Sequence, residues 1–134
     1  MEKNFSMMSV TPFQQGMDKK GRTMAGEALG LTGCEVSFNY TPPGRFVPFV
    51  HSHKKNEEVY IFVGGNGFMK VDDEEVPVED GTVIRVAPAG ERAIKAGDGG
   101  LVHICIQAED GSLTQANQAD GIINESKASW MTSE

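Results

Sequence analysis

The sequence predicts an all-β protein built as a small antiparallel sandwich or barrel. Between residues 34 and 107, short runs rich in Val, Ile, Phe and Tyr recur, and many start about ten residues apart. Turn-forming residues separate the runs, and no stretch there sustains an apolar period of about 3.6 residues. Glycine accounts for 16 of the 134 residues, about 12% against an average near 7%, so many tight turns are expected.

The predicted strands follow one another through the middle of the chain. Six runs of six or seven residues fit the pattern: 34–40, 57–63, 67–72, 74–79, 82–87 and 101–107. The sequence Gly-Gly-Asn-Gly at 64–67 predicts a hairpin turn between the second and third runs. The acidic residues at 72–75 predict a solvated hairpin tip between the third and fourth runs.

The length predicts one domain covering residues 1–134. Residues 1–33 are weakly patterned and predict an N-terminal arm or edge strands, while residues 34–107 form the barrel core. Residues 108–134 are polar and predict a C-terminal tail. We expect Trp130 to anchor this tail by docking on the domain or on a partner subunit.

Charge and cysteine content exclude several classes of partner and location. Twelve basic and 19 acidic residues leave a net charge of −7, which repels phosphate backbones and anionic membranes, so neither nucleic acid nor a membrane is an expected partner. There is no signal-peptide pattern and no apolar run of about 18 residues. A cytoplasmic location follows, with Cys34 and Cys105 expected as buried thiols and a single bridge between them as the alternative.

Two of the three histidines, His51 and His53, lie two residues apart. On a strand they would share a face with backbones roughly 6.6 Å apart, close enough for both imidazoles to reach one ion at about 2.1 Å. A turn over residues 52–56 would let the run 57–63 return beside them and bring Glu57 or Glu58 opposite. Two imidazoles and a carboxylate form a catalytic metal set. The alternative is that both histidines are polar side chains that bind no metal.

At these residues the sequence resembles the cupin superfamily. The long form of the first cupin motif is matched by His51, His53, Glu58 and Gly65, and the short form by the same histidines with Glu57 and Gly64. Glu58 is preferred because the run from 57 to 65 resembles cupin strands in which the second acid is the ligand. The second motif is matched by Gly81, Pro88 and Gly90, but Ala93 stands at its histidine position.

The resemblance covers residues 34–107 and implies a small double-stranded β-helix, or jelly-roll, barrel like those of stand-alone bacterial cupins. It further implies a divalent metal, zinc, iron, nickel or manganese, held by His51, His53 and Glu58. Without a histidine at 93, the ion would keep more open positions and bind more weakly. His103 could supply an extra ligand; the alternative is a hydrogen-bonded histidine of the core or surface.

The function implied is binding or conversion of an unknown small organic molecule, with Arg92, Tyr60 and Phe62 as candidate substrate contacts. Arg92 could hold a carboxylate in a bidentate pair, and the two aromatic rings could form an apolar wall. As an enzyme, the protein would be a metal-dependent oxygenase, isomerase or lyase. The alternative is a non-catalytic binding or sensing cupin without a functional metal. The resemblance also implies a homodimer.

Overall fold

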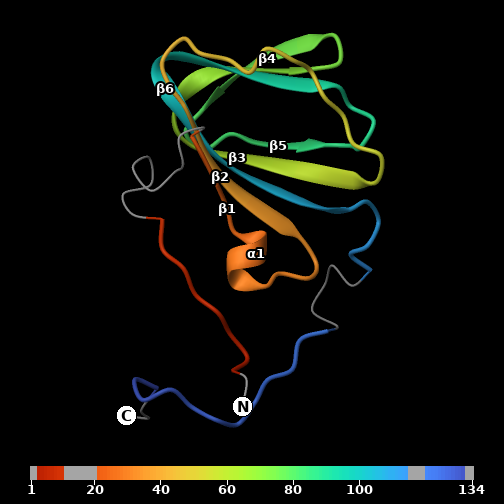
Figure 1. Ribbon diagram of the computed structural model, residues 1–134. Coiled ribbons are helices and arrows are strands. Elements are labelled where there is room, and N and C mark those ends of the chain that lie inside the picture. The colour runs from red at the N-terminus through yellow and green to blue at the C-terminus, as the bar shows by residue number, and fades with distance from the viewer. Residues whose placement is uncertain (1–2, 11–20, 115–119, 132–134) are drawn as a thin grey trace.

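Two long, bent strands organise the structure, a computed structural model in which residues 3–10, 21–114 and 120–131 are described (Figure 1). Strands β3 (Asn56–Val71) and β6 (Arg92–Glu109) pair antiparallel along nearly their whole length. Their register shifts between Phe62 and Gly64 and again between Gly65 and Gly67. Such irregularities bend a ladder, so each long strand contributes to both halves of the curved sheet.

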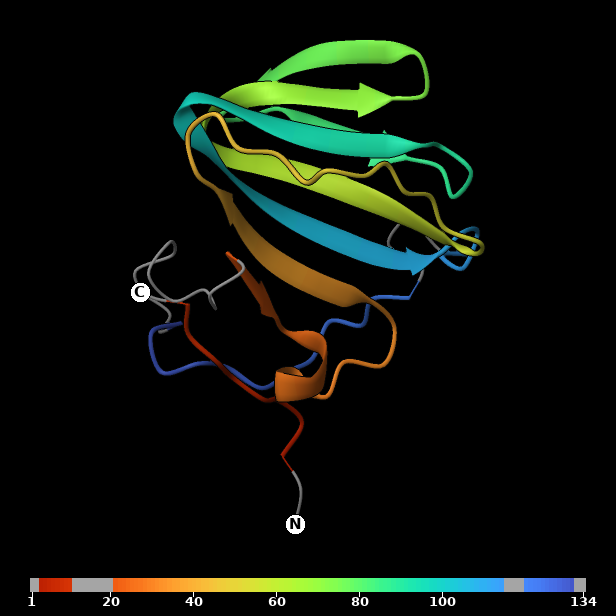
Figure 2. The ribbon, with the colours of Figure 1, turned by 45° about the horizontal axis from the view of Figure 1, so that its top comes forward.

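The shorter strands complete the two halves. On one half, β1 (Arg22–Met24) pairs with β2 (Glu35–Thr41), β2 with the second part of β6, and β5 (Val83–Val86) with the first part of β3. On the other, β4 (Glu74–Glu79) pairs with the second part of β3. Figure 2 shows the sheet curling from β4 down to β1, with the helical turn α1 (Gly26–Leu29) below.

The core lies between these halves. Phe62, Val86 and Leu101 come from the first half, Met69 and Val78 from the second, and all five belong to one buried cluster. Apolar side chains from facing sheets therefore meet in the interior, as the binary pattern of a barrel requires. The predicted all-β class is confirmed.

The predicted hairpin turn at 64–67 is wrong, because these residues lie inside β3. Gly65 has a φ of +80°, and a Cβ there would lie 1.9 Å from the carbonyl oxygen of Gly100. The glycines thus allow β3 and β6 to approach closely at the bend, which is a different use of the same residue type. Because the stretch before residue 101 is also rich in glycine, the sequence pattern did not predict the first half of β6.

The terminal segments differ from expectation in two side chains. Trp130 is 79% exposed, so it does not dock on the barrel, and its docking on a partner subunit stays a prediction. Cys34 is exposed, whereas Cys105 is buried as predicted, and the two thiols are not bonded to each other. Parts of the predicted arm and tail, residues 1–2, 11–20, 115–119 and 132–134, lie outside the described residues. In the part of the chain that is described, no helix is long and apolar enough to cross a membrane.

Candidate metal centre

The two clustered histidines lie on the segment 42–55, which runs along the edge of the first part of β6. Backbone hydrogen bonds join His51 to Arg92 in both directions, at 3.1 and 2.9 Å, and the His53 amide donates to the Pro88 carbonyl oxygen at 2.8 Å. The chain turns after His53 and β3 brings Glu58 opposite the histidines, as predicted, but β3 is not their backbone partner. Their backbone neighbours are β6 and the turn before it.

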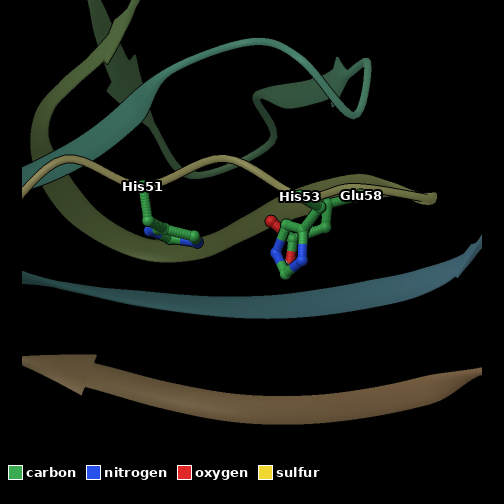
Figure 3. A group of neighbouring side chains, drawn as sticks. All are labelled: His51, His53 and Glu58. Carbon is green, nitrogen blue, oxygen red and sulfur yellow. The ribbon is translucent and has the colours of Figure 1, made fainter.

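Despite this, the side chains of His51, His53 and Glu58 converge. One donor atom from each lies within 4.8 Å of the others. Figure 3 shows both imidazoles and the Glu58 carboxylate gathered between the segment that carries the histidines and β6. The imidazole rings lie edge to face with centroids 5.2 Å apart. The three predicted ligands therefore form one group on the inner side of the barrel.

One pair of these donors has the spacing expected of two ligands of a divalent ion. His53 Nε2 lies 3.2 Å from Glu58 Oε2, yet this buried nitrogen makes no hydrogen bond with any described residue. Two ligands each about 2.1 Å from an ion, with an angle near 100° between them, would be about 3.2 Å apart. A buried nitrogen without a hydrogen bond is costly, and an ion bound by both atoms would remove that cost.

The Glu58 carboxylate is oriented by two donors on its other oxygen. Oε1 accepts hydrogen bonds from Tyr60 Oη at 2.5 Å and from Arg92 Nη1 at 2.7 Å. Burial raises the pKa of Glu58, but these two hydrogen bonds and the nearby positive charges lower it more, so the pKa lies below its usual value. The carboxyl group is therefore ionised, with Oε2 directed toward His53.

The rival acid, Glu57, lies on the opposite face of β3. Its Oε1 accepts a hydrogen bond of 2.7 Å from Arg85 Nε, and Arg85 also contacts Asp110 at 3.0 Å. These groups are on the outer surface, as expected for the neighbour of an inward-facing strand residue. Of the two predicted acids, only Glu58 lies with the histidines.

Arg92 is only 1% exposed. Besides Glu58, its guanidinium donates to the carbonyl oxygens of Gly90 at 2.9 Å, Ala87 at 2.7 Å and Pro88 at 3.3 Å. Its contact with a substrate stays a prediction. The described hydrogen bonds give Arg92 a different role, because they neutralise Glu58 and hold the turn that precedes β6.

Ala93, the residue at the predicted histidine position, lies on the outer face of β6. It pairs with Lys70 and lines a surface pocket with Phe46 and Phe68. The inward-facing neighbour is Arg92. A side chain at position 93 therefore points away from the three ligands, whatever its chemistry.

The third histidine, His103, is separate from this donor group. Its ring lies 5.6 Å from Tyr60 and 5.5 Å from Phe62, centroid to centroid. Burial lowers the pKa of His103 to about 4, so the ring is neutral near pH 7. Tyr60 and Phe62 are themselves buried in the core cluster. Whether His103 or these aromatic residues contact a ligand stays a prediction.

The protonation state of His51 also suits a metal ligand. Burial lowers its pKa, and the positive charges of Arg92 and Arg22 add to this effect, whereas Glu58 opposes it. A histidine must be neutral to bind a metal, so the lowered pKa keeps His51 available as a ligand at neutral pH.

Sequence reasoning missed the polar residues of β2 and β1 that share the inner face with Glu58. Ser37 and Asn39 are buried, and Asn39 Oδ1 accepts a hydrogen bond of 3.0 Å from Arg22 Nε. The alternation of β2 was visible in the sequence, but it normally indicates apolar residues inside and polar residues outside. On β2 the polar side chains of Ser37 and Asn39 instead face the interior of the barrel.

No family model and no curated protein matches this chain. Among solved structures, a cupin protein from Bacteroides fragilis is 40% identical over 92% of this chain and 99% of its own, with a TM-score of 0.83. A Cupin 2 conserved barrel domain protein from Salinispora arenicola is 18% identical, with 59% and 66% coverage and a TM-score of 0.53. A predicted oxalate decarboxylase from Thermotoga maritima is 22% identical, with 57% and 64% coverage and a TM-score of 0.50. The last two show likeness of fold only. The extent and identity of the first match show that this chain belongs to the cupin superfamily.

Proposed function

We propose that the protein binds one divalent metal ion through His51, His53 and Glu58 and uses its remaining coordination positions to bind a small organic molecule. The observation that supports this proposal is the convergence of the three donor groups, in which the buried His53 Nε2 lies 3.2 Å from Glu58 Oε2 without making a hydrogen bond to a described residue. When bound, the ion would supply a Lewis acid that polarises an oxygen of that molecule. An oxygenase, isomerase or lyase reaction would be compatible with this site.

The residues around the ligands have defined roles in this proposal. Arg92 and Tyr60 keep Glu58 ionised and occupy Oε1, so that Oε2 serves as a single ligand atom. The positive charge of Arg92 also cancels the charge of Glu58. The three ligands and Arg92 together are therefore neutral, and we expect weaker metal affinity than for a site with an uncompensated carboxylate.

A second function, small-molecule binding without a metal, is supported by the same ion pair. Glu58 already has a buried cationic partner at 2.7 Å, so its charge does not require a metal ion for compensation. In that case His51 and His53 would donate or accept hydrogen bonds to the ligand directly.

Glu58→Gln separates the two functions, with Glu57→Gln as a matched control. Each removes one carboxylate from the same strand, but only Glu58 faces the histidines. After incubation with zinc, iron, nickel or manganese and removal of free ion, elemental analysis should find about one equivalent in the wild type and in Glu57→Gln. Glu58→Gln should lose most of it.

His53→Ala provides a second test, because this side chain is partly exposed and its truncation is tolerated more easily than a change at Glu58. It should lose metal in the same way. Equal metal contents in the wild type, Glu58→Gln and His53→Ala would contradict the metal site and favour the metal-free alternative.

A further inference from the structure

Strand β3 lies between β5 and β6 and carries apolar residues on the face turned away from the metal ligands. Val59 pairs with Ile106 on β6. Ile61 pairs with Val83 on one side and with Ile104 on the other. Residues directly opposed on neighbouring strands share a face, and the neighbours of inward-facing residues point outward. Five aliphatic side chains therefore form one block, which we call the outer apolar face: Val59, Ile61, Val83, Ile104 and Ile106.

The outer apolar face is not explained by packing within the barrel. Within the described part of the chain, none of its five residues belongs to the buried core cluster or packs against it, and Val83 is 60% exposed. The solvent face of an antiparallel sheet is normally polar, and a contiguous apolar patch there marks an interaction surface. Arg85, the charged residue in the same block, is already paired with Glu57 and Asp110. The face therefore suits an apolar partner.

The C-terminal segment 120–131, which we call the tail segment, has the complementary property. Its residues Ile122, Ile123 and Trp130 are 81%, 100% and 79% exposed. The hydrogen bonds described for this segment join residues of the segment itself. Figures 1 and 2 both show it extended below α1. Three large apolar side chains are thus left in water, and covering them with an apolar surface would be favourable.

A second copy of this chain supplies both surfaces. Each copy has one tail segment and one outer apolar face, so a two-fold pairing covers both twice and forms a closed dimer. Ile122, Ile123 and Trp130 offer roughly 350 Å² of side-chain area in each tail segment. Two tail segments and the two faces that receive them would bury about 1,400 Å² in total, within the range of about 1,200–2,000 Å² for stable interfaces.

We propose that two copies of the chain associate by exchanging tail segments, so that residues 120–131 of each copy lie on the outer apolar face of the other and Trp130 is buried in the contact. Two strand spacings separate β5 from β6, about 10 Å, which is wide enough for an indole ring. The resemblance to cupins implies a homodimer but neither its surface nor the segment that forms it. Because the face lies on the opposite side of β3 from Glu58, the proposal does not depend on the metal centre.

Trp130 is the single tryptophan of the chain, so its fluorescence reports the tail segment directly. For the full-length protein at about 100 µM, light scattering should give twice the mass of one chain. At that concentration the emission of Trp130 should be shifted to the blue relative to N-acetyltryptophanamide and protected from quenching by acrylamide. Dilution should return the mass and the emission together to those of the single chain.

Four variants at exposed positions test the contact, because substitutions there leave the fold of the single chain intact. Ile123→Asp in the tail segment and Val83→Lys on the outer apolar face should each raise the dissociation constant about tenfold or more, since each places a charge in an apolar contact. Leu113→Asp and Phe68→Lys make the same changes at exposed residues outside both surfaces. These two controls should change the dissociation constant less than about twofold.

A mixture of Ile123→Asp and Val83→Lys distinguishes exchange between copies from docking on the same chain. Alone, each variant loses both contacts of the symmetric pair. In a mixed pair, the intact tail segment of Val83→Lys can lie on the intact face of Ile123→Asp. Mixing should therefore recover part of the association and part of the blue shift. A tail segment that docks on its own chain would gain nothing from mixing.

Several results would overturn the proposal. A single-chain mass at about 100 µM would exclude the dimer, and a dimer in which Trp130 emits like N-acetyltryptophanamide would show that another surface forms it. A blue-shifted Trp130 in a monomer, or mixing without recovery, would assign the face to the tail segment of the same chain. Equal effects of Ile123→Asp and Leu113→Asp, or of Val83→Lys and Phe68→Lys, would show that the contact lies elsewhere.

Discussion

Replacing Arg92 with methionine should destabilise the metal-free protein strongly and make it depend on a bound metal. Methionine is flexible and apolar, so it can fill much of the same space without a charge. The substitution removes the 2.7 Å contact with Glu58 and the hydrogen bonds to the three carbonyl oxygens of residues 87, 88 and 90. Glu58, only 4% exposed, would then carry an unpaired charge.

The magnitude follows from that unpaired charge. Removing one partner of a buried ion pair costs about 3–5 kcal/mol of unfolding free energy. For a domain of this length the melting temperature should fall by roughly 10–20 °C. Arg92→Lys keeps the positive charge but lacks the planar fork, so it should lose less stability than Arg92→Met.

A divalent ion should recover part of the loss. In the wild type, Arg92 and the ion compete to compensate the same carboxylate, whereas in Arg92→Met the ion alone does so. Zn²⁺ should therefore raise the melting temperature of Arg92→Met by more than that of the wild type. The assay is thermal denaturation in chelator and in excess Zn²⁺, followed by circular dichroism.

Arg85→Met is the control, because Arg85 makes its ion pairs with Glu57 and Asp110 on the surface. Exposed pairs contribute little, so this variant should melt close to the wild type and respond to Zn²⁺ equally. If Arg92→Met is as stable as the wild type in chelator, the ion pair is not structurally important. If Zn²⁺ stabilises Arg92→Met no more than the wild type, charge compensation by the metal is refuted.

Three further predictions concern the bend, the core histidine and the outer face of β6. Gly65→Ala should lose at least about 2 kcal/mol more in urea denaturation than Gly44→Ala, because both have positive φ but only Gly65 meets a backbone oxygen, that of Gly100. The metal-free protein should lose about 3 kcal/mol as pH falls from about 6.5 to 4, since unfolded His103 binds a proton in this range and the folded ring, with its pKa of about 4, does not. Ala93→His should leave zinc content unchanged by elemental analysis, because that side chain faces outward.

A specific result would contradict each of these three predictions. Equal losses in the two glycine variants would mean that contact between the strands at the bend does not constrain Gly65. A pH dependence that His103→Gln leaves unaltered would assign the acid sensitivity to other groups. A gain in metal affinity on Ala93→His would show that the start of β6 can rotate its outer face inward.

The strands and the three ligands were predictable because both depend on local spacing. Alternation of apolar residues identified β2 and β4 closely, and it identified parts of the other main strands. The His-x-His spacing with an acid five residues later likewise placed three donors together, since the chain between them is short. The choice of Glu58 over Glu57 came from the resemblance, because strand alternation alone did not decide between them.

What could not be predicted depends on pairing between distant residues. Glycines at 64–67 serve equally in a hairpin and in a close strand crossing, and only the position of Gly100 on β6 decides which. The inward direction of Ser37 and Asn39 likewise depends on residues that are distant in the sequence. Their apolar neighbours Val36 and Phe38 are half-buried and line a pocket together with Met7 and Met8 of the N-terminal arm, so neither face of β2 is fully exposed and alternation loses its usual meaning.

The position of Arg92 depends both on local spacing and on strand pairing. Counting along the second motif leads to Ala93 and suggests that a ligand is missing, but the pleat of β6 places position 92, not 93, toward Glu58. A permanent positive charge therefore occupies the inward position, where a neutral donor would strengthen metal binding. Because that charge already compensates Glu58, the energy of the proposed metal binding would come mainly from His51 and His53, whose imidazoles would be neutral ligands. An ion bound there would therefore carry excess positive charge into the barrel.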